Sequence, residues 1–275
     1  MTGREDEDDN DELRPLWRLC GDRNRLPPRP QHFAVRPGSD PRADPARYVR
    51  FDPRPEVKTG AIFIVLPGGN YDECGVDCAE GRDTALWLTL LGITAVVLEY
   101  RVRSQGHFWP AQLEDFIDCA VAVRRDAEKW GCDEARIGVI GFSAGGHLAS
   151  TAAQTCAPEI RPKLQILVYP AIDTKSPHDR SSEPWQAALG YPPVEASTHL
   201  MVNSDSPPAF LASIGADTCT PHLENVAVYE EALKIHGIPC ETVVNYDKEL
   251  EHGCGMCDWW TLPCEEWLRW HSWAA

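Results

Sequence analysis

The sequence predicts an α/β protein with a mostly parallel central sheet and helices on both faces. Apolar segments of strand length alternate with segments of helical periodicity along most of the chain. Several of the strand-like segments are apolar at almost every position, which is typical of parallel strands buried on both faces. No internal repeat or linker interrupts this alternation, so we predict one domain over 46–275, preceded by an acidic tail and irregular lead-in over 1–45.

The first half of the domain opens with strand-like segments. Residues 46–53 are expected to form an early antiparallel strand. Residues 61–69, "AIFIVLPGG", are an apolar run that ends in Pro-Gly-Gly, so they predict a buried strand followed by a turn. Residues 79–92 have apolar side chains at helical spacing and a terminal glycine. Residues 93–100, "ITAVVLEY", predict the next buried strand.

The middle of the chain continues the alternation. Residues 110–131 open with proline and close with glycine, which predicts a long helix. Residues 136–142, "RIGVIGF", predict a strand, 144–156 a helix of small residues, and 163–170, "KLQILVYP", another strand.

The last part of the chain adds two strands and two helices. Strands are predicted at 208–215 and 240–246, an amphipathic helix at 223–237, and an aromatic-rich helix at 257–273. The stretch from about 171 to 206 is rich in proline, serine and histidine. We expect it to form a short cap insertion over the end of the sheet where open α/β sheets bind ligands.

Composition limits the classes of partner. The chain has 26 Lys and Arg against 42 Asp and Glu, which gives a net charge of −16. This negative charge repels phosphate backbones and anionic lipids, so we expect neither a nucleic acid nor a membrane as partner. The apolar runs are also too short to span a bilayer. A small neutral or cationic molecule is the partner that this negative charge favours.

The eleven cysteines are odd in number, and many lie inside apolar patterns typical of buried free thiols. Because residues 1–15 lack an apolar signal-peptide core, we expect a cytoplasmic location and no disulfide framework. Cys74, Cys78, Cys254 and Cys257 would offer four zinc ligands if folding joined them, but ordinary free thiols are favoured. We therefore predict no metal and no cofactor.

One sequence motif indicates a catalytic residue. Residues 141–145, Gly-Phe-Ser-Ala-Gly, join a buried strand directly to a helix. In this setting the glycines allow strand and helix to approach closely, and Ser143 sits on a sharp turn with its hydroxyl exposed above the helix N-terminus. The pattern alone is weak because such a match arises by chance in about one chain of this length in ten. Its partners therefore decide the interpretation.

A serine nucleophile needs a base, and the base needs an orienting acid. In this architecture the acid and then the histidine follow the serine, each just past the end of a strand. Asp217 follows the strand predicted at 208–215, and His252 lies in the loop after the last strand. We predict that His252 accepts the Ser143 proton and that Asp217 holds the imidazole.

Other acids and histidines are weaker candidates. Asp173 follows the preceding strand and is the alternative acid. Asp247 and Glu251 flank the last loop, but Glu251 is adjacent to His252 and badly placed to reach its far nitrogen. The remaining histidines of interest are expected to be structural or exposed: His147, His199 and His222.

Acyl transfer also needs two donors for the oxyanion. The first is the amide of Ala144, directly after the serine. The second is expected from the loop "LPGGNY", where Gly68 and Gly69 allow close backbone approach, so the amide of Gly69 or Asn70 can point inward.

These motifs together resemble the α/β-hydrolase superfamily, and within it the acetyl-xylan-esterase-like carbohydrate esterases. The resemblance runs from about Gly60 to the end and includes "PGGNY", "EYRV", "GFSAGGHLAS", "LVYPAID" and "EHGCG", of which "GFSAGGHLA" is the most specific. It implies the same roles for Ser143, Asp217, His252 and the loop from Gly68 to Asn70. The chain departs from the family pattern at Asn70, where a third glycine is usual, and at Glu251, where a small residue is usual.

The expected activity is hydrolysis of small carboxylic esters, such as acetyl groups on a sugar or polyol. Tyr71, Phe108 and Trp109 on neighbouring loops, with Trp185 of the insertion, are expected to narrow the substrate pocket and favour short acyl groups. Two alternatives stay open: an amidase or arylformamidase with the same triad, and a non-catalytic binding protein on the same fold. The oligomeric state is not predicted.

Overall fold

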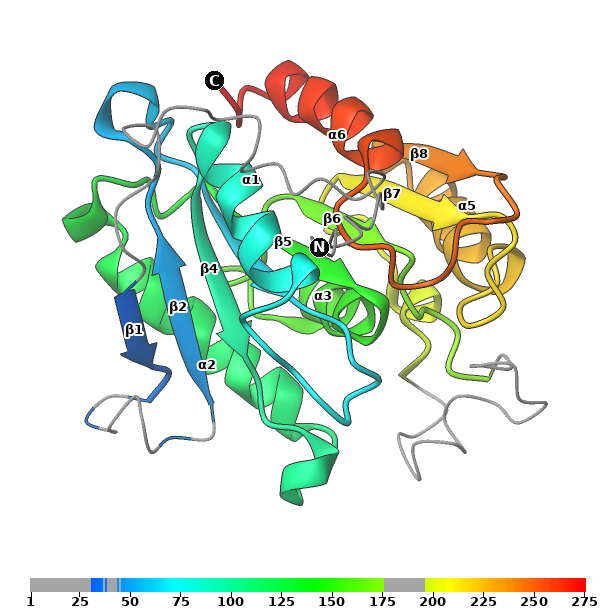
Figure 1. Cartoon of the computed structure of the whole chain (residues 1–275), viewed down its shortest axis with the longest axis horizontal. Helices are drawn as coiled ribbons and strands as arrows, with labels where there is room; N and C mark the ends of the chain where they lie inside the picture. Colours follow the sequence, from blue (N-terminus) through cyan, green and yellow to red (C-terminus); the bar gives the residue numbers. More distant parts are fainter. Residues whose placement is uncertain (1–30, 37, 39–43, 45, 176–195) are drawn as a thin grey trace, which may run out of the picture.

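The structure is a computed structural model that describes residues 31–36, 38, 44, 46–175 and 196–275. Its centre is a sheet whose described strands follow the order β1-β2-β4-β3-β5-β6-β7-β8 (Figure 1). From β4 onward across this order every pairing is parallel, whereas β1–β2 and β2–β4 are antiparallel. The predicted α/β class with a mostly parallel sheet is therefore confirmed.

The strands lie where the apolar segments predicted them, with one addition. The strands are β1 (Gln31–Ala34), β2 (Arg47–Phe51), β3 (Ile62–Leu66), β4 (Thr94–Glu99), β5 (Ile137–Phe142), β6 (Gln165–Val168), β7 (Ala209–Ile214) and β8 (Cys240–Asn245). β1 lies in the segment expected to be an irregular lead-in. It forms an edge strand there because its backbone pairs with β2, from Gln31 with Arg50 to Ala34 with Arg47.

The longer helices also match the predicted segments: α1 (Thr84–Leu90), α2 (Ala111–Asp126), α3 (Ser143–Thr155), α5 (Val228–Ile235) and α6 (Asp258–Trp270). Two of them are preceded by π-helical turns, η4 (Ala79–Asp83) before α1 and η9 (Leu223–Ala227) before α5. Among the described residues, no helix is both long and apolar enough to cross a bilayer.

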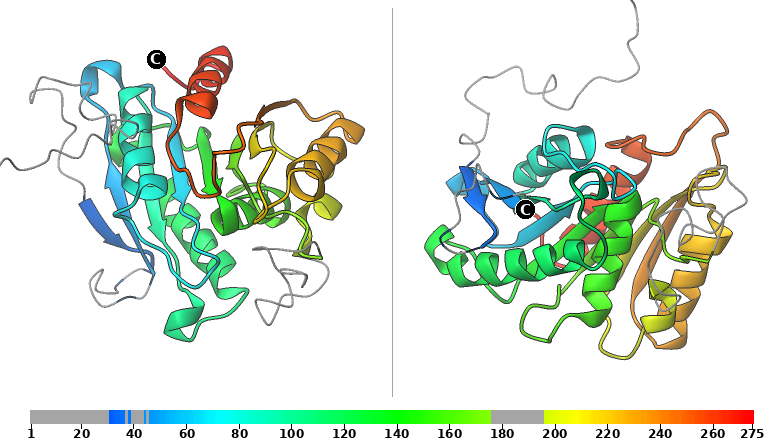
Figure 2. Two further views of the ribbon diagram at one scale, coloured as in Figure 1. Left: turned by 45° about the vertical axis from the view of Figure 1, so that its right-hand side comes forward. Right: turned by 90° about the horizontal axis from the view of Figure 1, so that it is seen from below.

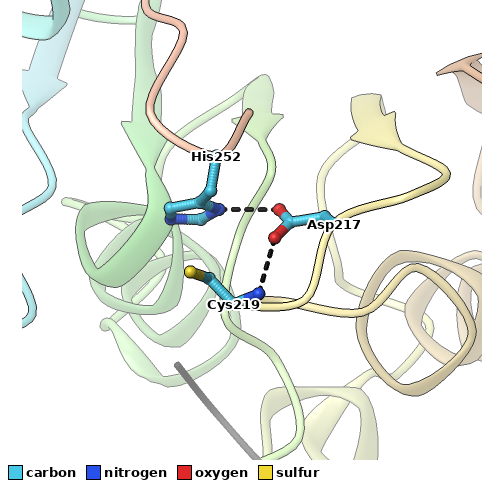
Figure 3. Close-up of side chains that lie close together, drawn as sticks. All are labelled: Asp217, Cys219 and His252. Atoms are coloured by element: carbon cyan, nitrogen blue, oxygen red, sulfur yellow. Dashed lines mark hydrogen bonds and ion pairs between the residues drawn. The ribbon is translucent and has the colours of Figure 1, made fainter. Parts of the chain in front are cut away.

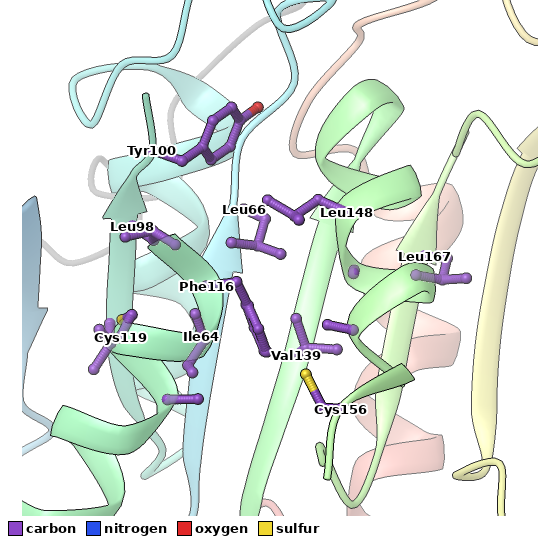
Figure 4. Close-up of a cluster of buried hydrophobic side chains, with 14 of the residues drawn as sticks. Ile64, Leu66, Leu98, Tyr100, Phe116, Cys119, Val139, Leu148, Cys156 and Leu167 are labelled. Atoms are coloured by element: carbon purple, nitrogen blue, oxygen red, sulfur yellow. The ribbon is translucent and has the colours of Figure 1, made fainter. Parts of the chain in front are cut away.

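Two hydrophobic clusters cover the two faces of the sheet. On one face α2, α3 and α5 pack on strand residues such as Ile64, Leu98 and Val139. Figure 4 shows the part of this cluster under α2 and α3. On the other, α1 and α6 pack on the alternate strand positions, such as Phe63 and Val97. The two helix layers are separated by the sheet in the views of Figure 2. The central strands are therefore buried on both sides, as their continuous apolar sequences require.

Parallel strands bring the loops after their carboxyl ends to one edge of the sheet. The loops after β3, β5, β7 and β8 carry the four segments expected to hold the site. Most of the cap insertion expected at 171–206, including Trp185, lies outside the described residues.

Candidate active site

Ser143 lies at a sharp junction between β5 and α3. It is the first residue of the helix, and its φ of 51° is in the left-handed region, which is costly for a residue with a side chain. The flanking glycines make this turn possible. A Cβ on Gly141 would lie 2.3 Å from the carbonyl oxygen of Gly145, and one on Gly145 would lie 2.1 Å from the carbonyl oxygen of Leu66. The close approach that the motif predicted is present.

The structure brings His252 and Asp217 to Ser143. Figure 3 shows the His252 and Asp217 side chains of this group. Asp217 comes shortly after β7, and His252 lies in the loop after β8. The Nε2 atom of His252 is 2.8 Å from the Ser143 hydroxyl oxygen. Its Nδ1 atom is 2.6 Å from Asp217 Oδ2. The hydroxyl, imidazole and carboxylate thus form one continuous hydrogen-bonded chain.

Asp217 is held by more than the histidine. Its carboxylate is buried and accepts hydrogen bonds from the backbone amides of Cys219 at 2.7 Å and Thr220 at 3.1 Å. The Thr220 hydroxyl donates a further bond to Oδ2 at 2.9 Å. Burial works to raise the pKa of Asp217, but the His252 contact and the two amides outweigh it, so the pKa is lowered. The carboxylate therefore stays ionised at neutral pH.

Asp173, the alternative acid, has different partners. Its Oδ1 atom accepts hydrogen bonds from the Ser197 hydroxyl at 2.8 Å and from the Lys175 amide at 3.0 Å. Asp173 therefore holds the segment around Ser197, while Asp217 holds the imidazole. Asp247 caps its own turn by accepting the amide of Glu249.

The loop after β3 faces Ser143. Gly69, with φ of 121°, and Asn70, with φ of 55°, turn the backbone back on itself. Gly69 and Asn70 line a cavity of about 370 Å³ together with Ser143 and His252. The amide of Ala144 belongs to the first turn of α3, where an amide has no carbonyl one turn earlier in the helix. These are the positions from which two donors can address one oxyanion.

The predicted substrate-binding residues do not line this cavity. Tyr71 is buried rather than open to it, because its positive φ of 58° turns it into the core, where its hydroxyl is 2.9 Å from His147 Nδ1. Trp109 packs on the Tyr71 and His147 rings. Phe108 is exposed on the neighbouring loop. Trp185 lies outside the described residues.

The cavity is instead polar and acidic. Asp72, Glu73, Glu80 and Cys219 line it, and no large aliphatic side chain does so among the described residues. Cys219 lies near Asp217 and His252 because its amide is bonded to that carboxylate (Figure 3). Sequence reasoning missed these four residues. Asp72, Glu73 and Cys219 carried one signal, their place in a loop that follows a strand, whereas Glu80 carried none.

The four cysteines weighed as a zinc site do not converge. In the described part of the chain, the one group of three or more possible ligands whose atoms lie within 4.8 Å of each other is Asp217, Cys219 and His252. All ten cysteines in the described ranges are free thiols, as expected from their apolar surroundings.

A family model described as the alpha/beta hydrolase fold matches residues 84–246. An acetylxylan esterase of Xylanibacter ruminicola is 30% identical over 212 residues, which are 74% of this chain and 43% of that protein. The chain thus spans less than half the length of this relative. An arylacetamide deacetylase of Oryctolagus cuniculus is 42% identical over 90 residues, 30% of this chain and 22% of that protein.

Among solved structures, an acetyl ester-xyloside bifunctional hydrolase from Caldicellulosiruptor lactoaceticus is similar over 91% of this chain and 99% of its own. The two chains are 30% identical, and the TM-score is 0.73. The similarity therefore extends over nearly the whole of the neighbour.

Proposed function

This chain belongs to the alpha/beta hydrolase fold family, and on that premise we propose that it cleaves small carboxylic esters through a serine acyl-enzyme. The relatives support an esterase-type hydrolase. The serine mechanism is carried by one observation: the hydrogen-bonded chain from Ser143 through His252 to Asp217, which opens on a cavity beside the loop of Gly69 and Asn70. A nucleophile, its base and an orienting acid are the three groups that this chemistry needs.

The first half-reaction follows from the positions of these groups. The Ser143 oxygen attacks the ester carbonyl carbon while its proton passes to Nε2 of His252. The carbonyl oxygen becomes an oxyanion, which the amide of Ala144 and that of Gly69 or Asn70 stabilise. The ionised Asp217 stabilises the imidazolium through Nδ1. The imidazolium then protonates the leaving alcohol as the carbon–oxygen bond breaks, and the acyl group remains on Ser143.

Water completes the cycle by the same path. It loses a proton to His252 as it attacks the acyl carbon, and the proton returns to the Ser143 oxygen as the acid product leaves. With the ester and water as reactants, the proton transfers balance through Ser143 and His252.

We propose an acetyl group on a sugar or polyol as the substrate class. The acetylxylan esterase and the acetyl ester-xyloside hydrolase, by their names, act on such molecules, and they support this choice. The polar lining of the cavity also favours a leaving group rich in hydroxyls, since carboxylates accept hydrogen bonds from hydroxyl groups.

Amide hydrolysis is the second candidate. The observation that favours it is the local match to arylacetamide deacetylases, one of them at 42% identity. The two candidates separate on a matched pair of substrates, phenyl acetate and acetanilide, assayed side by side. Turnover of acetanilide at a kcat/KM within tenfold of phenyl acetate would favour the amidase.

The serine mechanism is tested with p-nitrophenyl acetate on the wild type, Ser143→Ala and His252→Ala. Both variants should lose at least about three orders of magnitude in kcat. Once a triad member is removed, only oxyanion stabilisation and substrate binding still accelerate the reaction. An exposed histidine, replaced in His236→Ala, serves as the matched control and should keep wild-type activity. Full activity in Ser143→Ala would overturn the proposal.

A further inference from the structure

Glu80 lies between two loops of the site. It belongs to the π-helical turn η4, and its carboxylate contacts the cavity. One oxygen, Oε2, accepts the backbone amide of Gly68 at 2.7 Å. The other, Oε1, accepts the hydroxyl of Tyr169 at 2.8 Å. The carboxylate thus ties the loop after β3 to the residue that follows β6.

Tyr169 extends this connection to the loop after β8 that carries His252, the histidine loop. Its hydroxyl oxygen accepts the backbone amide of Gly255 at 2.9 Å. Gly255 is held from its other side by the Trp260 indole, which donates to its carbonyl oxygen at 2.9 Å. A Cβ on Gly255 would lie 2.8 Å from that of Ala79, the neighbour of Glu80. The histidine loop and the turn of Glu80 are therefore packed directly together.

The Tyr169 ring also contacts the base itself. Its centroid is 5.0 Å from that of His252, with the rings at 60°. The backbone of Tyr169 is in the left-handed region, with φ of 35°, a costly conformation that the surrounding contacts must hold. Its carbonyl oxygen lies 3.1 Å from the Thr220 hydroxyl oxygen, whose one proton is shared between this carbonyl and Asp217 Oδ2. Tyr169 thus contacts the loops of Asp217 and His252 directly, is linked to the loop after β3 through Glu80, and packs on Phe142, the residue before Ser143.

We propose that Glu80 and Tyr169 act as one hydrogen-bonded unit. This unit positions the loop from Gly68 to Asn70, the oxyanion loop, relative to His252. This inference deepens the proposed function and rests on it. The Gly68 amide fixes the orientation of the backbone that leads into Gly69 and Asn70, whose amides are the expected oxyanion donors. The Gly255 amide fixes the loop three residues after His252. One carboxylate and one phenol therefore set the distance between donor and base.

The direction of the hydrogen bonds is unambiguous. A backbone amide only donates, so the Tyr169 oxygen accepts from Gly255 and the Tyr169 hydroxyl donates its proton to Glu80 Oε1. Burial, followed by the nearby Glu80 charge, raises the pKa of Tyr169 well above its usual value, so the phenol keeps its proton. A Gln at position 80 would offer one acceptor and one donor, and its donor would compete with the Gly255 amide for the Tyr169 oxygen.

Positioning predicts a loss in kcat with little change in KM, because the donors matter most to the transition state. Tyr169→Phe and Glu80→Gln should each lower kcat by about tenfold to a hundredfold, the size expected for misplaced groups. The double variant should lose little more than either single one, because the unit is broken once either member is lost. Two residues that act independently would instead give multiplicative losses, and a merely structural role would lower thermal stability without this selective loss in kcat.

The experiment measures kcat and KM for p-nitrophenyl acetate and the inhibition constant of a phenylboronic acid, which forms a tetrahedral adduct at the serine. In both variants the inhibition constant should rise by about the same factor as kcat falls. The matched controls are Asp77→Asn and Tyr246→Phe. Asp77 is an exposed carboxylate three residues before Glu80, and Tyr246 is an exposed tyrosine. Thermal unfolding confirms that each variant is folded, and the conservative Glu80→Asp tests the position if Glu80→Gln unfolds.

Wild-type kcat and boronate affinity in Tyr169→Phe and Glu80→Gln, or fully multiplicative losses in the double variant, would overturn the positioning role. Such a result with an inactive Ser143→Ala would leave the serine mechanism standing. An active Ser143→Ala would overturn the proposed function itself, so the two failures are distinguishable.

Discussion

The Nε2 atom of His252 lies 2.8 Å from the hydroxyl oxygen of Ser143, although the two residues are 109 positions apart in the chain. One is at the start of a helix and the other is in a loop after an edge strand. Their contact depends on the parallel sheet, which places the ends of β5 and β8 on the same side.

Asp217→Asn should lower kcat by about four orders of magnitude, because an amide at this position favours the wrong imidazole tautomer and cannot stabilise the imidazolium. Asp173→Asn is the matched change on the neighbouring loop, and its kcat should fall by less than tenfold. Steady-state kinetics of both variants with p-nitrophenyl acetate decide between the two acids. A severe loss in Asp173→Asn with a mild one in Asp217→Asn would exchange their roles.

His147 should make the protein less stable in mild acid. It is fully buried, its Nε2–H donates to the Ala196 carbonyl, and its Nδ1 accepts the Tyr71 hydroxyl. Burial lowers its pKa from 6.5 to about 4. The unfolded chain therefore binds the proton first, so this residue's contribution is complete above pH 6.5 and is lost as the pH falls towards 4.

The free energy of unfolding should lose about 2 kcal/mol between pH 7 and pH 5 from this residue alone. Urea titrations at the two pH values measure it. In His147→Gln the baseline stability will be lower, but the part of the pH dependence that comes from this residue should disappear. An identical slope in both proteins would show that His147 is not the source.

Gly145→Ala should damage the site through packing. Its Cβ would lie 2.1 Å from the carbonyl oxygen of Leu66 and 2.5 Å from that of Pro67, at the start of the oxyanion loop. Overpacking of this kind costs about 1–3 kcal/mol and shifts backbone. We expect a lower melting temperature together with reduced kcat.

Gly75→Ala is the control for stability, because a Cβ there meets nothing within 4 Å. Its free energy of unfolding should stay within about 0.5 kcal/mol of the wild type. Equal stability of the Gly145→Ala and Gly75→Ala proteins would contradict the close strand–helix approach.

Short acyl chains should be preferred. The cavity at Ser143 is about 370 Å³, and among the described residues its lining includes Asp72, Glu73 and Glu80 but no large aliphatic side chain. A longer chain gains about 0.8 kcal/mol per CH₂ only where apolar surface can bury it. In a series of p-nitrophenyl esters from acetate to dodecanoate, kcat/KM should be highest at two to four carbons. A rise through the long chains would point to a lipase instead.

Local sequence predicted the sheet and the three proposed triad residues, because each depends on a pattern within one segment. Strands buried on both faces are apolar throughout, and Ser143, Asp217 and His252 each lie just past a strand end. Pairing between segments is less visible. Gln31–Ala34 is only four residues long, and it becomes β1 through its backbone contacts with β2.

Side-chain direction was the main error. Tyr71 was expected to face the substrate, but two successive residues in the left-handed region, Asn70 and Tyr71, turn it into the core. The contribution of Glu80 was equally hidden, since its partners Gly68 and Tyr169 are 12 and 89 positions away. Neither the backbone conformation nor these long-range hydrogen bonds leave a periodic signal in the sequence.

The most direct test of the central claim is to identify the residue that a fluorophosphonate modifies. The wild-type protein should gain a single adduct, and peptide mass spectrometry should place it on Ser143, because the serine oxygen displaces fluoride while His252 accepts its proton. Ser143→Ala should gain no adduct, and Asp217→Asn should react much more slowly. An adduct on another residue, or equal labelling of Ser143→Ala and the wild type, would contradict the assignment of Ser143 as the nucleophile.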